Sequence, residues 1–317
     1  MQAMIRKYSY LILMAALPLF AACSQDEEFQ QKDGDSSEVP VPLRIGAVDM
    51  PQSASFSLCA WIDDAPSINR NQSPWIGGAM VSYDANQQAW TATSSSGENL
   101  LRWRNNTSPH YFLAYSPADL LSANYNNPYY DCTVELSDDE TSYDYLMAQT
   151  AGIRSTDNNC KVSLNFKHMM AKLVVNLMLP AYFEDQLSDY SFVVSATTYQ
   201  KATFNFLRQD NHGMPIFNAA GMKKLTKLYD QAPNTPSMNR TYSRLLIPQS
   251  GVRNISVACI EEYHTETYRY AHPEDIPLQA GKVTTINLVF LDDEILVGTV
   301  TLQDWVSSQD IETDVEE

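Results

Sequence analysis

The chain has 317 residues, with 38 acidic and 21 basic side chains and a formal net charge of −17 at pH 7. This acidic balance argues against nucleic-acid binding, because contacts to phosphate need clustered lysine and arginine. A chain of this length usually forms two domains. The composition therefore favours a self-repelling surface protein that is built from more than one domain.

The first 22 residues have the features of a secretory signal. Two basic residues, Arg6 and Lys7, precede a short apolar run over residues 8–20, and two alanines follow it. The run is too short to span a bilayer, which takes about 20 apolar residues. A positive start, a short apolar core and small residues at its end predict a signal peptide over residues 1–22.

The junction after this segment, Phe20-Ala21-Ala22-Cys23, resembles the lipobox of bacterial lipoproteins. The resemblance implies cleavage before Cys23 and acylation of that residue, palmitate included, with about 0.8 kcal/mol of anchoring per buried CH₂. The alternative is an ordinary signal peptide with an incidental cysteine. Residues 24–28, SQDEE, resemble the acidic tag that sends lipoproteins of Bacteroides-type bacteria to the cell surface, although a solvated spacer has the same composition. Residues 23–38 are predicted to form an acidic tether.

Beyond the tether, apolar residues recur mostly at every second position. Val162, Leu164 and Phe166 share one face of a predicted strand, with Ser163 and Asn165 opposite. A second predicted strand places the following residues on one face: Phe56, Leu58, Ala60 and Ile62. Strands of this kind, separated by Pro, Asn, Asp and Ser, predict an all-β fold of sandwich type.

Two segments interrupt the strand pattern and are predicted to be short helices. Residues Pro180 to Ser188 open with proline, which suits a first helical turn. Residues Gly221 to Gln231 have an amphipathic spacing, with one face formed by Met222, Leu225, Leu228 and Tyr229. Both segments are expected to be packing elements.

Four cysteines remain after Cys23, and they contain no CxxC pair. Export permits disulfides, but four cysteines allow three pairings. Cys59 and Cys259 lie within strand-like runs and are expected to be buried thiols. Cys132 and Cys160 lie in loop-like sequence and are the candidate disulfide.

The sequence contains none of the common catalytic, nucleotide-binding or calcium-binding motifs. We therefore expect no enzymatic activity, no cofactor and no metal site. His168 follows a strand and is expected to be a partly buried hydrogen-bonding residue. The tryptophans could stack on sugar rings, but core packing is favoured for them and for the tyrosines at 125, 129 and 130. The histidines are not spaced as metal ligands: His110, His168, His212, His264 and His272.

Four segments, in order, resemble the fimbrillin family of Bacteroides-type bacteria. They are YFLAYSP at 111–117, VSLNFKHMMAKLVVNL at 162–177, LLIPQ at 245–249, and LQAGKVTTINLVF with TVTLQDW over 278–305. The second segment is the most specific, with the pattern formed by Phe166, His168, Ala171, Lys172 and Leu173. The resemblance implies two transthyretin-like β-sandwich domains, at 39–178 and 179–317, and a surface-exposed, lipid-anchored protein of the outer membrane.

The resemblance also implies assembly with other fimbrillin subunits by strand donation. In shaft subunits, an arginine-specific protease removes the first strand, and a strand from the next subunit fills the groove. The candidate first strand here is Val39–Val48. No Arg or Lys occurs between Ile45 and Asn69, so the candidate processing residues are Arg44, inside that strand, and Arg70, beyond the next one.

The last predicted strand, Ile295–Trp305, carries apolar residues on both faces. This pattern predicts a strand that is buried on both sides. It is either the last core strand or part of a donor segment, residues 295–317, that moves as a unit into a neighbouring subunit.

These features favour a structural component of a surface pilus, such as a tip or accessory subunit, that takes part in adhesion. The alternative is a surface lipoprotein that does not polymerise and binds glycans or host ligands through exposed aromatic residues. An enzyme ranks third.

Replacement of Cys23 by alanine should leave an unlipidated precursor, because the thiol that carries the acyl chain is missing. Detergent phase partitioning of the wild type and Cys23→Ala compares their lipid content directly. A variant that partitions and migrates like the wild type would contradict the lipoprotein assignment.

Overall fold

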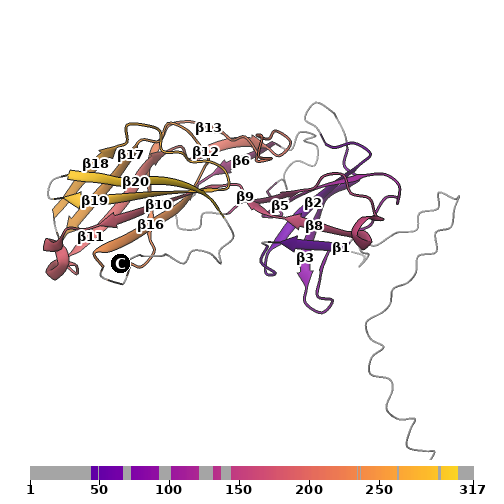
Figure 1. Ribbon diagram of the computed structural model, residues 1–317, viewed down its shortest axis with the longest axis horizontal. Coiled ribbons are helices and arrows are strands. Elements are labelled where there is room, and N and C mark those ends of the chain that lie inside the picture. Colours follow the sequence, from indigo (N-terminus) through magenta and orange to yellow (C-terminus); the bar gives the residue numbers. More distant parts are fainter. Residues whose placement is uncertain are drawn as a thin grey trace, which may run out of the picture. The chain divides into compact units, whose positions relative to one another are not determined.

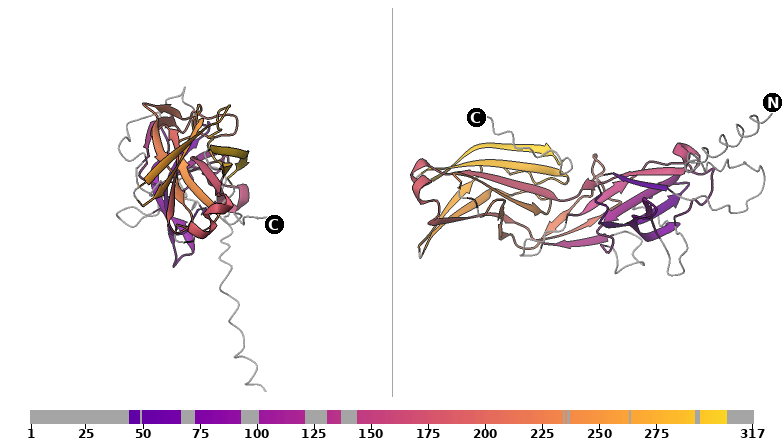
Figure 2. Two further views of the ribbon diagram at one scale, coloured as in Figure 1. Left: turned by 90° about the vertical axis from the view of Figure 1, so that its left-hand side faces the viewer. Right: turned by 90° about the horizontal axis from the view of Figure 1, so that it is seen from below.

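A computed structural model describes residues 44–48, 50–66, 73–92, 101–120, 131–136, 144–233, 235, 237–262, 264–291 and 294–305 (Figures 1 and 2). The predicted signal peptide, the predicted tether with Cys23, and Arg70 lie outside the described residues. No helix within the described ranges has the length and apolar character needed to cross a membrane. The fold is all-β, as the sequence predicts, with two short 3₁₀ helices, η1 (Asp157–Cys160) and η2 (Ala181–Gln186).

The N-terminal strands form a six-stranded antiparallel sheet and a two-stranded pair. The pair joins β1 (Arg44–Val48) in parallel to β8 (Lys161–Asn165). The larger sheet has the order β4 (Ala89–Thr91), β3 (Ile76–Asp84), β2 (Ser55–Ile62), β5 (His110–Ser116), β7 (Leu146–Gln149), β9 (Lys167–His168).

A hydrophobic cluster, here called the smaller core, fills the space beside β2 and β8. Every second residue of β8 is buried, with Val162, Leu164 and Phe166 at 1%, 0% and 4% exposure. Their partners from β2 are Phe56, Leu58 and Ala60, so the predicted inward residues of both strands are confirmed except for Ile62, which is only partly buried. The alternation in β8 exists because one of its faces packs on this core.

The C-terminal strands form a sandwich of two sheets, which Figure 2 shows as separate layers. The five-stranded sheet has the order β15 (Tyr229–Asp230), β16 (Asn239–Leu246), β10 (Ala171–Met178), β19 (Lys282–Leu291), β20 (Glu294–Asp304). The four-stranded sheet has the order β14 (Lys224–Lys227), β11 (Tyr190–Thr198), β17 (Asn254–Glu261), β18 (His264–Ala271). A second cluster, the larger core, includes the inward residues of these strands.

A three-stranded sheet connects the two halves of the chain. It has the order β13 (Asn218–Ala220), β12 (Lys201–Asn205), β6 (Asp131–Glu135), and β6 comes from the N-terminal half. The rings of Tyr115 in β5 and Phe206 after β12 stack at 4.9 Å. Cys59 and Trp61 of β2 join the larger core, so β2 is buried on both faces.

The predicted division into 39–178 and 179–317 stays a prediction, and the strand pairing argues for a different border. A cut at 178 would separate β10 from β16 and β19, its partners along its whole length. We propose that the second sandwich begins at Ala171, because β10 supplies Leu173, Val175 and Leu177 to the larger core.

The two predicted helices have different outcomes. The 3₁₀ helix η2 lies within Pro180–Ser188 and buries Phe183. The helix predicted over Gly221–Gln231 is wrong, because this segment forms β14 and β15. Leu225 is 63% exposed while Thr226 is buried, which is the alternation of a strand paired with β11. Pairing with a neighbouring strand overrides the local helical pattern.

Phe166→Ala should lower the free energy of unfolding by about 3–5 kcal/mol, as for other buried aromatic residues. Phe166 is 4% exposed, and its ring lies 5.1 Å from that of Phe56. Ser163→Ala, on the exposed face of β8, is the matched control and should change stability little. A loss below about 1 kcal/mol in urea denaturation of Phe166→Ala would place this side chain outside the core.

Candidate functional site

The C-terminal edge of the five-stranded sheet is the first part of the candidate site. The edge strand β20 pairs with β19 from Asp304 opposite Lys282 to Glu294 opposite Leu291. No other strand of the described chain pairs with β20. An unpaired strand edge is a template for another chain.

The prediction that Ile295–Trp305 is buried on both faces is wrong. Leu296 and Leu302 are 44% and 39% exposed, while Ile295 is buried against the larger core. A β-bulge places Thr299 opposite Asn287 but Val297 opposite Leu288, so Gly298 has no register partner. An extra residue in one strand reverses the faces of the residues beyond it.

Beyond β20, Trp305 is held by residues from three other segments. The ring of His168 in β9 stacks on the indole at 3.7 Å between centroids and 3° between planes. The ammonium group of Lys172 in β10 lies 5.6 Å from the indole centroid. The backbone N–H of Trp305 donates to the carbonyl of Gly281 at 2.9 Å. We call Trp305, His168, Lys172 and Asp144 the Trp305 clamp.

A carboxylate orients the stacked imidazole. His168 Nδ1 and Asp144 Oδ2 lie 2.6 Å apart, and the ring N–H donates to the carboxylate. The other oxygen, Asp144 Oδ1, is buried and has no hydrogen-bond partner among the described residues. Burial lowers the pKa of Lys172, and the nearby charge of Asp144 opposes this shift. The expectation that His168 is a partly buried hydrogen-bonding residue is confirmed.

Two further features fix the C-terminal end of β20, near Asp304. Lys282 Nζ donates to Asp304, and this bond, followed by the charge of Lys282, lowers the pKa of the Asp304 carboxyl. Gly281 has a positive φ of 69°, and a Cβ there would lie 3.0 Å from the carbonyl oxygen of His168. Only glycine suits that conformation and that close approach.

The clamp brings together residues of two segments that resemble the fimbrillin pattern. His168 and Lys172 come from the most specific segment, and Trp305 ends the last one. The LLIPQ segment has a structural role of its own at the turn between β11 and β12. The Gln249 side chain accepts from the backbone N–H of Tyr199 at 2.8 Å and donates to the carbonyl of Ile247 at 3.0 Å.

The N-terminal strand is the second part of the candidate site. β1 pairs with β8 from Arg44 opposite Lys161 to Val48 opposite Asn165. Cleavage after Arg44 would leave residues 45–48 paired with β8. Cleavage after Arg70 would separate β2 as well as β1 from the rest of the chain, so neither arginine would release β1 alone. Processing at Arg44 or Arg70 stays a prediction.

The cysteines are placed in two different cores. Cys132 is buried in the larger core, while Cys160 packs against the smaller one, and their disulfide stays a prediction. Burial, followed by the charge of Asp131, raises the pKa of Cys132 to about 12. Burial, followed by Glu266 and Glu261, raises the pKa of Cys259 to about 11. Cys59 and Cys259 are buried, as the sequence predicts.

Three of the four tryptophans of the N-terminal half are buried: Trp61, Trp90 and Trp103 are 2%, 8% and 3% exposed and offer no platform for a sugar ring. Trp75 is partly buried against the smaller core. The tyrosines at 125, 129 and 130 lie outside the described residues. No group of three metal-ligating side chains gathers within the described ranges.

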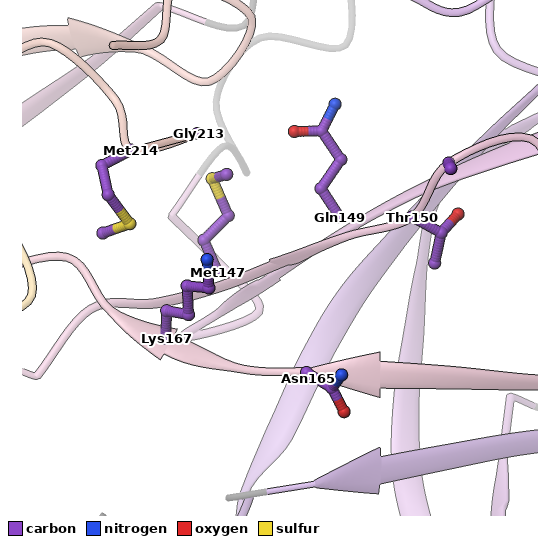
Figure 3. Close-up of a pocket in the computed structure, with 8 residues that line it drawn as sticks. Met147, Gln149, Thr150, Asn165, Lys167, Gly213 and Met214 are labelled. Carbon is purple, nitrogen blue, oxygen red and sulfur yellow. The ribbon is translucent and has the colours of Figure 1, made fainter. Parts of the chain in front are cut away.

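A pocket of about 400 Å³ lies beside β7 and the end of β8 (Figure 3). Its labelled residues include Met147 and Met214, whose thioethers line it, and Lys167. Gln149 lines it too and accepts a hydrogen bond of 2.6 Å from Gln209. Its lining residues include no histidine, cysteine or carboxylate, so this pocket has no acid–base or nucleophilic pair.

These observations define an all-β sandwich protein. In the part of the chain that the structure describes, its candidate binding features are strand edges: the unpaired edge of β20 and the edge of β8 that pairs with β1. The sequence model of the fimbrillin-like family matches residues 51–305, and the chain belongs to this family. A search of the curated proteins found no match. Family membership supports the role of a pilus component at the cell surface.

Solved structures from Bacteroides share the fold. A candidate cell adhesion protein from Bacteroides uniformis and another from Bacteroides ovatus each have 14% identity and a TM-score of 0.61, over 86% of this chain and 100% of theirs. A fimbrial protein from Bacteroides vulgatus has 13% identity and a TM-score of 0.54, over 83% of this chain and 99% of its own. At these identities the likeness shows the fold alone.

His168→Ala should lower the free energy of unfolding by about 1–3 kcal/mol, because it removes a ring contact and a hydrogen bond to a carboxylate. His168→Phe is the matched control: it keeps a ring beside Trp305 but loses the bond to Asp144, so its loss should be smaller. Urea denaturation, with Trp305 emission obtained by difference from Trp305→Phe, measures both effects. If His168→Ala is as stable as the wild type, the clamp contributes nothing to the fold.

Proposed function

We propose that the chain is a lipid-anchored subunit of a surface pilus that assembles through residues 306–317 and takes part in adhesion. The observation that carries this proposal is the Trp305 clamp, which holds Trp305 against His168 and Lys172 and so fixes the end of the edge strand β20. The proposal keeps outer-membrane anchoring through Cys23 and partnership with other fimbrillin subunits. It narrows the donor segment from 295–317 to 306–317.

The cost of moving β20 supports this narrowing. Its removal would break the ladder with β19, uncover Phe290, which is 1% exposed, and take Ile295, which is 7% exposed, out of the larger core. Donation of residues 306–317 alone would leave that ladder and those two side chains in place. Twelve residues in extended form reach about 40 Å, which is enough to cross a sandwich. The apolar anchors of this segment are Val306, Ile311 and Val315.

The acceptor in this proposal is the smaller core of a neighbouring subunit. β1 is the described partner of β8, whose Val162 and Leu164 face that core. Loss of β1 would leave the backbone of β8 unpaired along that edge. A strand from another subunit would restore the ladder by β-augmentation. Because donor and acceptor are different surfaces, the contact propagates into a fibre.

The proposal is structural rather than enzymatic. Membership of the fimbrillin-like family supports this choice. The alternative is a surface lipoprotein that binds glycans through exposed aromatic residues without polymerising. The burial of Trp61, Trp90 and Trp103 argues against these three side chains as its binding platforms.

The test is to release Val39–Val48 from the purified protein through a protease site inserted after Val48. We expect ladders that survive mild SDS, since donated strands dissociate slowly. Deletion of residues 306–317 should abolish the ladders, while Leu296→Ser, a matched change on β20, should not.

Two results would overturn the proposal. Ladders that persist without residues 306–317 would show that another segment is the donor. A complete absence of ladders after release of the first strand would favour the lipoprotein that does not polymerise.

A further inference from the structure

A groove of about 720 Å³ lies over the outer face of the five-stranded sheet. This volume lies within the range of about 300–1,000 Å³ that is usual for ligand pockets. The groove is separate from β1 and β8, which the proposed assembly uses. Its lining residues include Asn176, Arg240, Thr241, Ser243, Thr285 and Trp305.

The strand period places most of these side chains outward. Arg240 is an exception, because it has the parity of the buried Tyr242 and lies over the ring of Phe192 at the end of β16. In β10, Leu173, Val175 and Leu177 are buried in the larger core, so Lys172, Val174 and Asn176 point the opposite way. The neighbouring strands contribute their own outward residues at matching register. The groove is therefore a surface feature of the sheet and not an extension of its core.

A row of hydrogen-bonded polar side chains crosses four strands at this face. Thr241 in β16 donates to Asn176 Oδ1 in β10 at 2.9 Å. Asn176 Nδ2 donates to Asn287 Oδ1 in β19 at 2.8 Å, and Asn287 Nδ2 donates to Thr299 in β20 at 2.6 Å. We call these four residues the amide row.

The amide row suits a ligand that is rich in hydroxyl groups. Each amide nitrogen carries a second N–H, and each hydroxyl oxygen keeps acceptor capacity. Because the side chains already hold one another in place, binding would cost little rotamer freedom. Ser243 and Thr285 add further hydroxyl groups within the groove.

The charges of the groove are balanced within it. Arg240 and Asp230 form an ion pair of 2.9 Å, with side chains 11% and 16% exposed. Asp304 is paired with Lys282, and Lys172 lies over the indole of Trp305. A neutral groove on a chain of net charge −17 favours a neutral ligand.

The same features argue against a protein segment as the ligand. A strand adds to a sheet through backbone groups at an edge, but on this face the backbone groups of β10 are paired with β16 and β19. Residues 306–317 are a poor match for a neutral groove, because their charged side chains are all acidic: Asp310, Glu312, Asp314, Glu316 and Glu317.

We propose that this groove binds a neutral oligosaccharide. Asn176 and Thr241 of the amide row, together with Ser243 and Thr285, would bond to its hydroxyl groups, while Val174, Val283 and the accessible part of Trp305 would contact its C–H faces. The inference rests on the adhesive part of the proposed function and does not depend on polymerisation.

Saturation-transfer NMR and calorimetry on the full mature chain would test it with lactose, cellobiose, mannotriose and N-acetylchitotriose as neutral probes and 3′-sialyllactose as the anionic one. We expect saturation transfer to at least one neutral probe. Ser243→Tyr should abolish binding by filling the groove, and Asn176→Ala should weaken it about tenfold, as expected for one or two lost hydrogen bonds. Thr267→Tyr, a matched change on the exposed part of β18, should leave binding unchanged.

Binding that survives Ser243→Tyr, binding of the sialylated probe alone, or no binding of any neutral probe would overturn the inference. Binding that appears only after deletion of residues 306–317 would also overturn it, because that segment would then be the ligand. The SDS ladders of Ser243→Tyr distinguish the two proposals: normal ladders without sugar binding mean that the groove is not needed for assembly.

Discussion

The pairing of β6 with β12 is the constraint on which the rest of the structure depends. It places a strand from the N-terminal half beside a strand that continues from β11 of the C-terminal sandwich. The larger core then takes residues from both halves, including Trp61, Tyr115 and Phe206. Since β2 packs on a core at each face, the N-terminal sheet is stabilised from two sides, and the two halves share part of the larger core.

This shared core connects the six-stranded sheet, which packs against β8 at the smaller core, to the sheet that holds β20, the last strand of the described chain. β1 lies beside β8 at the smaller core, while the Trp305 clamp fixes the end of β20 to β9 and β10. β9 and β10 follow β8 almost directly in the sequence. One short stretch of chain, Lys161–Met178, therefore contacts both β1, which the proposed assembly removes, and Trp305, which directly precedes the proposed donor segment 306–317. The most specific segment of the fimbrillin pattern lies within this stretch.

The sequence predicts the strands that have one clear core face, because their alternation is strict. Val162 and Leu164 in β8, with Phe166 directly after it, are the clearest case. Prediction from the sequence fails for Gly221–Gln231, because pairing with a distant strand overrides a helical spacing. It also fails for Ile295–Trp305, because the bulge at Gly298 exchanges the faces of the strand. The His168–Trp305 stack and the amide row join residues far apart in the chain, and no local pattern marks them. In the candidate site, the sequence identifies His168, Lys172 and Trp305 through family resemblance, but not their contact.

The amide row has a consequence for the alignment of β20. If β20 slid by one residue along β19, Thr299 would leave Asn287 and the outward residues would turn toward the core. The β-bulge and the amide row therefore fix the register of β20, whose other edge is unpaired in the described part of the chain. An unpaired strand edge that slips can pair with another chain and promote aggregation. A fixed register keeps β20 in one alignment, and in the proposed assembly it leaves strand addition to the edge of β8.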